Sequence, residues 1–299
     1  MYDFLKIRND TDEISILNNE HLNFQFNQDI NEPTEEITFP ITTKGRYKNF
    51  EFKVTENSIY SNGSIHKYWQ DGMNWGDFDL LQVEKAIQQY CSEFNVNPNS
   101  SQLHKIEFGV NITPPFAANL KNIRNTFISY KGTPFESLKS YSGQTIGVEC
   151  NLSQYRLKIY SKTLQYQLKE NVLRFEVQVK KMQKFPFEKV YLSDLLEAQF
   201  IEYCKAELIE VMQKIIIYDD SLIGLTAKEK IFLKDVSNPN YWASLNPSNR
   251  NKKKVKYDEL VKNNSRRFLK DELIKIVKEK GDVLTNLYTN TKATILPLV

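Results

Sequence analysis

The chain has 299 residues and a formal net charge of +3, and 40% of its residues are hydrophobic, 12% aromatic and 26% charged. This composition excludes an intrinsically disordered chain, and the length allows one large domain or one domain with an appendage. No apolar run approaches the ~20 residues that span a bilayer. Charged residues also interrupt the N-terminus from its third position, so we expect neither a membrane segment nor a signal peptide.

The three cysteines, Cys91, Cys150 and Cys204, are isolated from one another and show no CxxC spacing. An odd number of scattered cysteines indicates a reduced, cytoplasmic protein with incidental thiols. The histidines are scattered as well, so we do not expect a zinc site.

The N-terminal part of the chain reads as short strands followed by one helix. The strands are predicted at Met1–Arg8, Ile37–Ile41, Phe50–Val54 and Ser58–Ile65. Asp77 or Asp79 then caps a helix that runs to about Phe94. The aromatic-rich stretch His66–Phe78 is either a stacking platform for unpaired bases or a turn that closes the preceding strand against the core.

Three later stretches, Lys105–Ile112, Tyr155–Lys162 and Leu173–Lys180, alternate apolar and polar residues with period two. This pattern predicts half-buried strands with one dry face and one open face. The open faces carry Lys105, Glu107 and Asn111 in the first strand, Arg156, Lys158, Tyr160 and Lys162 in the second, and Arg174, Glu176, Gln178 and Lys180 in the third.

Two more strands are predicted between the first and second of these stretches, and helices are predicted after the third. Thr126–Tyr130 and Thr145–Cys150 add two strands, and Gln165–Asn171 reads as a hairpin loop. Helices are predicted at Leu192–Lys214, with Ser193 as cap, at Thr226–Asp235 and at Arg266–Lys280, with Ser237–Asn251 as a linker or exposed loop. The expected fold is α+β, with a central antiparallel sheet and helices on one of its faces in residues 1–215, then a smaller helical, basic region in residues 216–299.

Carboxylates on two of the alternating strands suggest a metal site. If the strands are neighbours, Glu107 and Glu176 repel each other unless a cation lies between them. Together with Asn111 they offer only oxygen ligands, which favours Mg²⁺ or Mn²⁺ over zinc. The alternative is that both carboxylates are simply solvated on an exposed strand face.

Tyr160 shares its strand face with Arg156, Lys158 and Lys162, and nearby cations favour the phenolate form. A phenolate beside a metal-bound phosphate could attack phosphorus and form a covalent phosphotyrosine. Tyrosine is also a favoured strand residue, so a packing role is the alternative.

The positive charge is concentrated near the C-terminus. The segment from Arg250 to Lys270 holds nine Lys or Arg residues against Asp258 and Glu259, which gives it a charge of +7 and leaves −4 on the remainder. Such a segment is typical of a polyanion-binding surface, although a lysine-rich solvated helix is the alternative.

The series KIEFGVNI, GVEC…YRLKIYSKTLQ and NVLRFEVQVKK resembles the Rep_trans family of rolling-circle replication initiators over about residues 48–215. That family carries the pattern RxDxAxD, RxYxK and RxExxxK on a sheet related to the HUH endonucleases. By position, Tyr160 matches the nucleophile, Lys162 the motif lysine, and Glu176 with Arg174 and Lys180 the third motif. Lys158 stands where the family has arginine, and Glu107, Asn111 and Lys105 replace its first aspartate, second aspartate and arginine.

The resemblance implies a metal-dependent DNA nicking and joining enzyme that initiates rolling-circle replication of a plasmid, phage or integrative element. In this hypothesis Tyr160 is the nucleophile, Lys158 and Lys162 assist it, and Glu107, Glu176 and Asn111 hold Mg²⁺ or Mn²⁺. The expected partners are origin DNA, single-stranded at the nick, a host helicase and a second copy of the chain. The expected DNA-binding residues are Arg156, Arg174, Lys180, Lys252, Lys253, Lys254, Arg266 and Arg267. A conjugative relaxase of the same family, or a DNA-binding protein without catalysis, remains the alternative.

Overall fold

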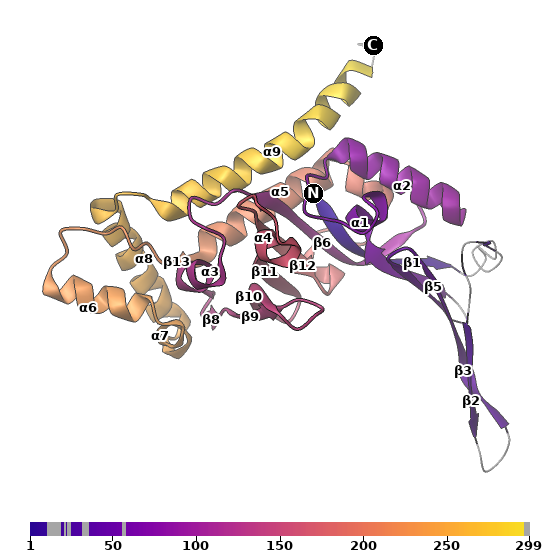
Figure 1. The fold of residues 1–299 in the computed structure, drawn as a ribbon, viewed down its shortest axis with the longest axis horizontal. Coiled ribbons are helices and arrows are strands. Elements are labelled where there is room, and N and C mark those ends of the chain that lie inside the picture. Colours follow the sequence, from indigo (N-terminus) through magenta and orange to yellow (C-terminus); the bar gives the residue numbers. More distant parts are fainter. Residues whose placement is uncertain (11–18, 21, 23–24, 32–35, 56–57, 296–299) are drawn as a thin grey trace. The chain divides into compact units, whose positions relative to one another are not determined.

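The computed structural model has the predicted α+β architecture, an antiparallel sheet followed by C-terminal helices, and it describes residues 1–10, 19–20, 22, 25–31, 36–55 and 58–295 (Figure 1). The strands are β1 (Tyr2–Asp10), β2 (Gln25–Asn31), β3 (Glu36–Tyr47), β4 (Phe50–Thr55), β5 (Ser58–Ser64), β6 (Gln102–Ile112), β7 (Phe127–Tyr130), β8 (Thr133–Pro134), β9 (Glu136–Lys139), β10 (Thr145–Asn151), β11 (Tyr155–Ser161), β12 (Leu173–Val179) and β13 (Ile215–Ile217). The α-helices are α1 (Ile65–Trp69), α2 (Leu80–Phe94), α3 (Leu120–Thr126), α4 (Lys162–Tyr166), α5 (Ala198–Lys214), α6 (Ala227–Val236), α7 (Pro239–Ser244), α8 (Pro247–Asn264) and α9 (Leu269–Ile295).

In the described part of the chain ten strands form one sheet, in the order β2-β3-β4-β5-β1-β6-β12-β11-β10-β9, and β13-β7-β8 form a smaller one. The chain comprises two compact units. Unit 1 is Met1–Phe108, Gln178–Glu202 and Val283–Val299, and unit 2 is Gly109–Val177 and Tyr203–Asp282. The predicted division at residue 215 stays a prediction.

In unit 1, helix α2 covers the apolar face of strand β4. Phe50 and Phe52 are buried there, whereas Glu51 and Lys53 of the same strand are exposed. The Phe52 and Phe94 ring centroids lie 4.7 Å apart, and Asp79 caps α2 with a capping box, as one of the two predicted caps. The dry face of the sheet in unit 1 is therefore closed by helices, and the polar face points the other way.

The aromatic-rich stretch His66–Phe78 packs partly into the core of unit 1, whereas Met73 and Trp75 are exposed. The His66 and Phe78 rings stack 4.6 Å apart and nearly parallel, and both residues, with Tyr68, are buried. Ser64 caps the short helix α1 at the end of β5. Closing the preceding strand against the core therefore describes His66, Tyr68 and Phe78, and the alternative of a base-stacking platform stays a prediction for the exposed Trp75.

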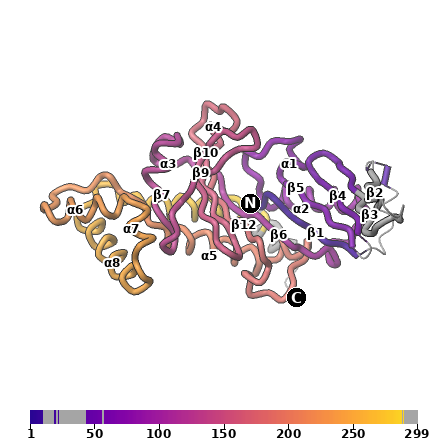
Figure 2. The backbone as a smooth tube through the Cα atoms, turned by 90° about the horizontal axis from the view of Figure 1, so that it is seen from below, coloured from indigo at the N-terminus to yellow at the C-terminus, as the bar shows by residue number. Residues whose placement is uncertain are grey.

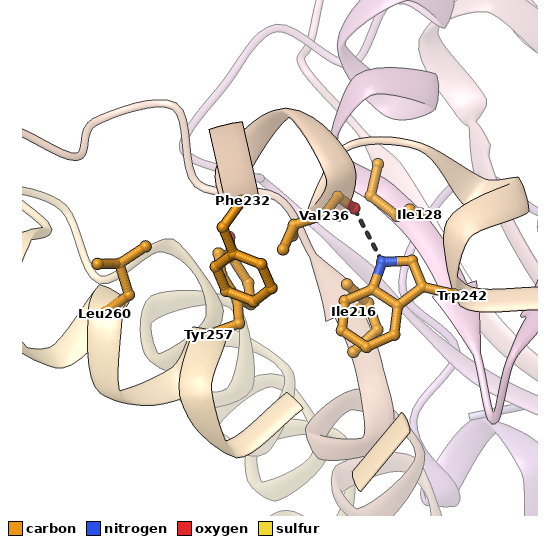
Figure 3. Close-up of a cluster of buried hydrophobic side chains, with 7 residues drawn as sticks. All are labelled: Ile128, Ile216, Phe232, Val236, Trp242, Tyr257 and Leu260. Atoms are coloured by element: carbon orange, nitrogen blue, oxygen red, sulfur yellow. Dashed lines mark hydrogen bonds between the residues drawn. The ribbon is translucent and has the colours of Figure 1, made fainter. Parts of the chain in front are cut away.

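In unit 2, helices α6, α7 and α8 share a hydrophobic core with the smaller sheet (Figure 3). The core consists of Ile128, Ile216, Phe232, Val236, Trp242, Tyr257 and Leu260. The indole Nε1 of Trp242 donates a hydrogen bond to the Val236 carbonyl at 2.8 Å. The prediction that Ser237–Asn251 is a linker or exposed loop is wrong, because this segment contains α7 and the start of α8. Apolar residues at helical spacing are sparse in it, and α7 is held mainly by the burial of one tryptophan.

Three other predicted boundaries differ in the structure. The helix expected from Leu192 begins at Ala198 and is preceded by a 3₁₀ turn at Ser193–Leu196. Helix α9 continues to Ile295, well past Lys280. The loop expected at Gln165–Asn171 begins after α4 instead, because Ser161 caps a helical turn at the end of β11.

No helix in the described part of the chain is both long and apolar enough to cross a membrane.

Trp242→Ala should destabilise unit 2 by about 3–5 kcal/mol, because it removes a fully buried indole and leaves the Val236 carbonyl unpaired. Ile231→Ala, on the exposed side of α6, should change stability by less than about 0.5 kcal/mol. Urea unfolding followed by circular dichroism measures both. Equal stability of the two variants would contradict the packing described for Trp242.

Candidate active site

Tyr160 lies on β11 with its side chain on the polar face of the strand. Leu157 and Ile159 point to the opposite, apolar face, as the alternation predicts. Tyr155 is on that apolar face too, and its hydroxyl pairs with the Tyr130 hydroxyl at 2.9 Å. Tyr160 is therefore separated from the neighbouring tyrosine of its own strand by the sheet.

The phenol of Tyr160 donates a hydrogen bond to Oε2 of Glu176 at 3.2 Å. Its ring packs with Leu138 and Ile146, so that only 6% of the residue is exposed. The expectation of a solvent-facing tyrosine on an open sheet surface is wrong. Apolar residues from β9 and β10 cover the ring, which a pattern within one strand cannot reveal.

Lys162 is not a strand residue but the first residue of α4, and it has no exposed surface. Ser161 ends the strand because its hydroxyl accepts the backbone N–H of Leu164 and caps the helix. The Lys162 ammonium lies 5.0 Å from the centroid of the Tyr160 ring and 5.3 Å from that of Tyr166. This position places a cation against the π face of the candidate nucleophile.

Glu176 on β12 is completely buried and engages two cations. Oε1 lies 2.5 Å from the Lys158 ammonium, and Oε2 accepts Nε of Arg174 at 2.6 Å. Burial alone would raise the pKa of Glu176, but the charges and hydrogen bonds of Lys158 and Arg174 outweigh it and hold the pKa well below its usual value. Glu176 is therefore an ionised carboxylate in the protein interior.

Arg174 links the third strand of this site to the first. Its Nη1 donates to Oδ1 of Asn111 at 3.1 Å, while its Nε is bound to Glu176. The side-chain oxygen that we expected to serve as a metal ligand thus accepts a hydrogen bond from a guanidinium. The polar faces expected to be open are closed here, since Asn111, Lys158 and Arg174 are all buried.

Two glycines that we did not single out from the sequence allow the strands to approach each other at this site. A Cβ on Gly147 would lie 2.5 Å from the Cβ of Tyr160, its register partner. A Cβ on Gly109 would lie 2.5 Å from the Cβ of Glu176. A glycine inside a strand is the sequence signal for such close approach, and both glycines sit opposite a residue of the site.

Two further carboxylates, Glu107 and Asp3, are buried within unit 1. Glu107 accepts a hydrogen bond from the Gln178 amide, and Asp3 accepts from Ser64 and, at 2.7 Å, from Asn74. Asp3, Glu107 and Glu176 are a buried group of acidic residues in the described chain that could hold a metal ion. Asp3 was not predicted because a single acid in a short N-terminal strand carries no spacing signal.

The predicted DNA-binding residues lie on several elements of the chain. Arg156 pairs with Glu149 at 2.9 Å, and Lys180 is half-buried just after β12. On α8, Lys252 is exposed and Lys253 and Lys254 are half-buried. Arg266 and Arg267 are exposed between α8 and α9, where Arg267 donates to the Pro115 carbonyl at 2.8 Å.

Among solved structures, the chain is similar to a rolling-circle replication initiator protein from Geobacillus stearothermophilus. The TM-score is 0.42 at 12% sequence identity, and the match covers 79% of this chain and 96% of that chain. No protein-family model matches the chain, and no curated protein does. A similarity at this level identifies neither the family nor the activity of this chain.

Glu176→Gln should destabilise the protein by about 3–5 kcal/mol, because it leaves Lys158 and Arg174 buried without a counter-charge. Glu149→Gln removes only the more exposed pair with Arg156 and should cost less than about 1 kcal/mol. Denaturant unfolding at neutral pH measures both changes. A Glu176 variant as stable as the Glu149 variant would contradict a buried, charge-neutralising role.

Glu176 should also make the folding stability of the protein depend on pH under acidic conditions. Because its pKa is lowered on folding, the stability from Glu176 is fully present above the unfolded value of about 4.3 and is lost as pH falls through the folded-state pKa. Stability of the wild-type chain should thus fall more steeply below about pH 4.3 than that of Glu176→Gln.

Proposed function

We propose that this chain is a DNA nicking and joining enzyme that initiates rolling-circle replication of a plasmid, phage or integrative element. One observation carries the proposal: the hydroxyl of Tyr160 is hydrogen-bonded to the buried, ionised Glu176 while the Lys162 ammonium lies against its ring. A tyrosine used only for packing needs neither contact. The Rep_trans-like motifs assign the same residues to the nucleophile and its surroundings.

The chemistry needs the Tyr160 oxygen to attack the scissile phosphorus in line with the 3′ oxygen of the preceding nucleotide. The new bond joins the phenolic oxygen to phosphorus, the bond from phosphorus to the 3′ oxygen breaks, and that oxygen leaves as a 3′-OH after taking up a proton. The hydrogen bond to Glu176 orients the phenol. The proton that the phenol loses to solvent balances the one that the leaving 3′ oxygen takes up. Lys162 opposes the negative charge that spreads into the ring, and Lys158 keeps Glu176 ionised.

The product is a 5′-phosphotyrosine, which conserves the energy of the phosphodiester bond for rejoining. The free 3′-OH can prime synthesis, and attack by a later 3′-OH on the phosphotyrosine releases Tyr160. This sequence of transfers consumes no nucleotide cofactor. The chain also shows no phosphate-binding glycine loop.

Asp3, Glu107 and Glu176 would hold the divalent cation that this reaction uses. Their donors are carboxylate oxygens, which fit Mg²⁺ or Mn²⁺. Such an ion supplies a Lewis acid that polarises the scissile phosphate. Asn111 would contribute by orienting Arg174 rather than through its own oxygen.

Two alternatives to a replication initiator are a conjugative relaxase and a DNA-binding protein without catalysis. A conjugative relaxase uses the same chemistry, and only the DNA it acts on separates it from an initiator. A DNA-binding protein without catalysis is favoured by a specific observation, that both oxygens of Glu176 already contact cations.

We also propose that residues 216–299 bind duplex DNA or a partner such as a host helicase, while residues 1–215 carry the chemistry.

Tyr160→Phe should abolish covalent attachment to DNA and leave DNA binding nearly unchanged. The substitution removes one hydroxyl, and Glu176 keeps both cations, so the loss of stability should stay within about 1.5 kcal/mol. The measurement is recovery of protein–DNA adducts on denaturing gels, with Mn²⁺ and supercoiled DNA that carries the element's own origin. Tyr155→Phe and Tyr166→Phe are matched controls that should form the adduct, and an adduct from the Tyr160 variant would reject this nucleophile.

Neutralising Lys252, Lys253 and Lys254 with glutamine should weaken duplex binding about equally for all sequences, since surface lysines contact phosphates. The slope of log affinity against log salt should fall by ~0.9 for each phosphate that the protein no longer neutralises. The triple Lys228, Lys230, Lys234→Gln on the neighbouring helix α6 changes the charge equally and is the control. If both triples give the same slope, the lysines of α8 are merely solvated.

A further inference from the structure

The polar face of the sheet in unit 1 carries a group of half-buried or exposed basic and aromatic residues. We define the basic face as Lys6 on β1, Lys53 on β4, Tyr60 on β5, and His104 and Lys105 on β6. The strand register makes it continuous, because Lys53 pairs with Tyr60 and Lys6 pairs with Lys105. Figure 2 shows β4, β5 and β1 side by side in unit 1.

Tyr60 is the aromatic centre of this face. The Lys6 ammonium lies 4.9 Å from the centroid of its ring, and the His104 ring meets it edge-on at 5.6 Å. All three residues are half-buried rather than enclosed. The core aromatics of unit 1 lie on the opposite face, so Tyr60 is not needed to fill that core.

In the part of the chain that the structure describes, the charges on the basic face have no acidic counterparts. Within the described residues, none of the three lysines takes part in an ion pair, and the nearby acids are already bound, Glu51 by Arg46 and Asp10 by Arg8. Burial and the charges of Lys105 and Lys53 lower the pKa of Lys6. Like charges held this close repel each other, and a bound polyanion would relieve that repulsion.

A β-bulge brings two residues of β6 to this face. The register with β1 shifts between Lys6 and Ile7, so that His104 and Lys105 both lie between the buried Leu103 and Ile106. Burial, followed by the charges of Lys6 and Arg8, lowers the pKa of His104, which therefore stays neutral and suits stacking. Glu107 follows on the same side of β6, so the basic face continues to one of the candidate metal ligands.

We propose that the basic face binds single-stranded DNA, with a base stacked at Tyr60 and the backbone phosphates held by Lys6, Lys53 and Lys105. Alternating lysines and an aromatic ring on a flat sheet suit unpaired bases, which expose their faces, whereas a duplex hides them. We further propose that the bound single strand is the DNA next to the nick, and this part of the proposal rests on the proposed function. The binding itself does not.

The test is fluorescence anisotropy with a labelled mixed-sequence single-stranded oligonucleotide, with every protein on the Tyr160→Phe background so that no adduct forms. A triple variant with glutamine in place of Lys6, Lys53 and Lys105 should reduce the slope of log affinity against log salt concentration by about 2. Each phosphate left without its lysine accounts for ~0.7 of this slope. The triple Lys85, Lys189, Lys278→Gln changes the same charge at exposed positions elsewhere and should keep the slope. Equal slopes for the two triples would overturn the proposal.

Two substitutions of one residue test the stacking without changing charge. Tyr60→Leu should weaken single-strand binding about tenfold, whereas Tyr60→Phe keeps a ring and should bind like the parent. Binding of the same sequence as a duplex should not distinguish these two variants. If leucine and phenylalanine bind the single strand equally, or if leucine weakens duplex binding to the same extent, a single-strand site at Tyr60 is wrong.

The two proposals can fail separately. If wild-type protein forms no adduct but the variants of the basic face lose single-strand affinity, nicking is wrong and the binding face stands. If adducts form and these variants bind normally, the reverse holds. Thermal unfolding of each variant confirms that it is folded before its affinity is compared.

Discussion

The candidate site depends on one constraint, that an ionised carboxylate without solvent access must be neutralised from within the protein. Glu176 meets it by holding Lys158 of β11 at one oxygen and Arg174 of its own strand at the other. An unpaired charge at this depth would cost several kcal/mol, so the two cations and the carboxylate fix one another's positions. The phenol of Tyr160 is bound to the same carboxylate, and its orientation is therefore set by this buried group rather than by solvent. Such preorganisation would serve Tyr160 in its proposed role as a nucleophile.

Close packing of the strands makes this burial attainable. Gly147 faces Tyr160 and Gly109 faces Glu176, each at a distance that a methyl group would not tolerate. The backbones of the neighbouring strands thereby lie close beside Tyr160 and Glu176. Leu138 and Ile146 cover the Tyr160 ring from the next strands. The result is a polar cluster with low solvent access, in which electrostatic effects between charged groups are stronger than at the surface.

Charge is used in two different ways in this chain. At Glu176 one buried carboxylate is paired with two cations, whereas on the basic face Lys6, Lys53 and Lys105 have no acidic partner among the described residues. Matched charges hold a geometry, and unmatched ones favour an external polyanion. The basic segment after Arg250 combines both roles. Arg250 itself donates to the carbonyls of Lys131 and Leu245 at 2.7 Å and so fastens α8, while Lys252 is exposed.

Most of the strands, several of the helices and the two faces of each alternating strand could be predicted from the sequence. Period-two alternation predicted β6, β11 and β12 and selected Tyr160 and Glu176, because side-chain direction in a strand is a local property. Only the tertiary structure decided which polar faces are buried and which residues meet. The alternation reads the same whether neighbouring strands cover a polar face or leave it open, so the burial of Lys162 and the contact between Arg174 and Asn111 were not predictable. Segment Ser237–Asn251 was misjudged for the same reason, since Trp242 becomes a core residue only through partners distant in the sequence. Local pattern fixes orientation, whereas burial depends on what the rest of the chain brings alongside.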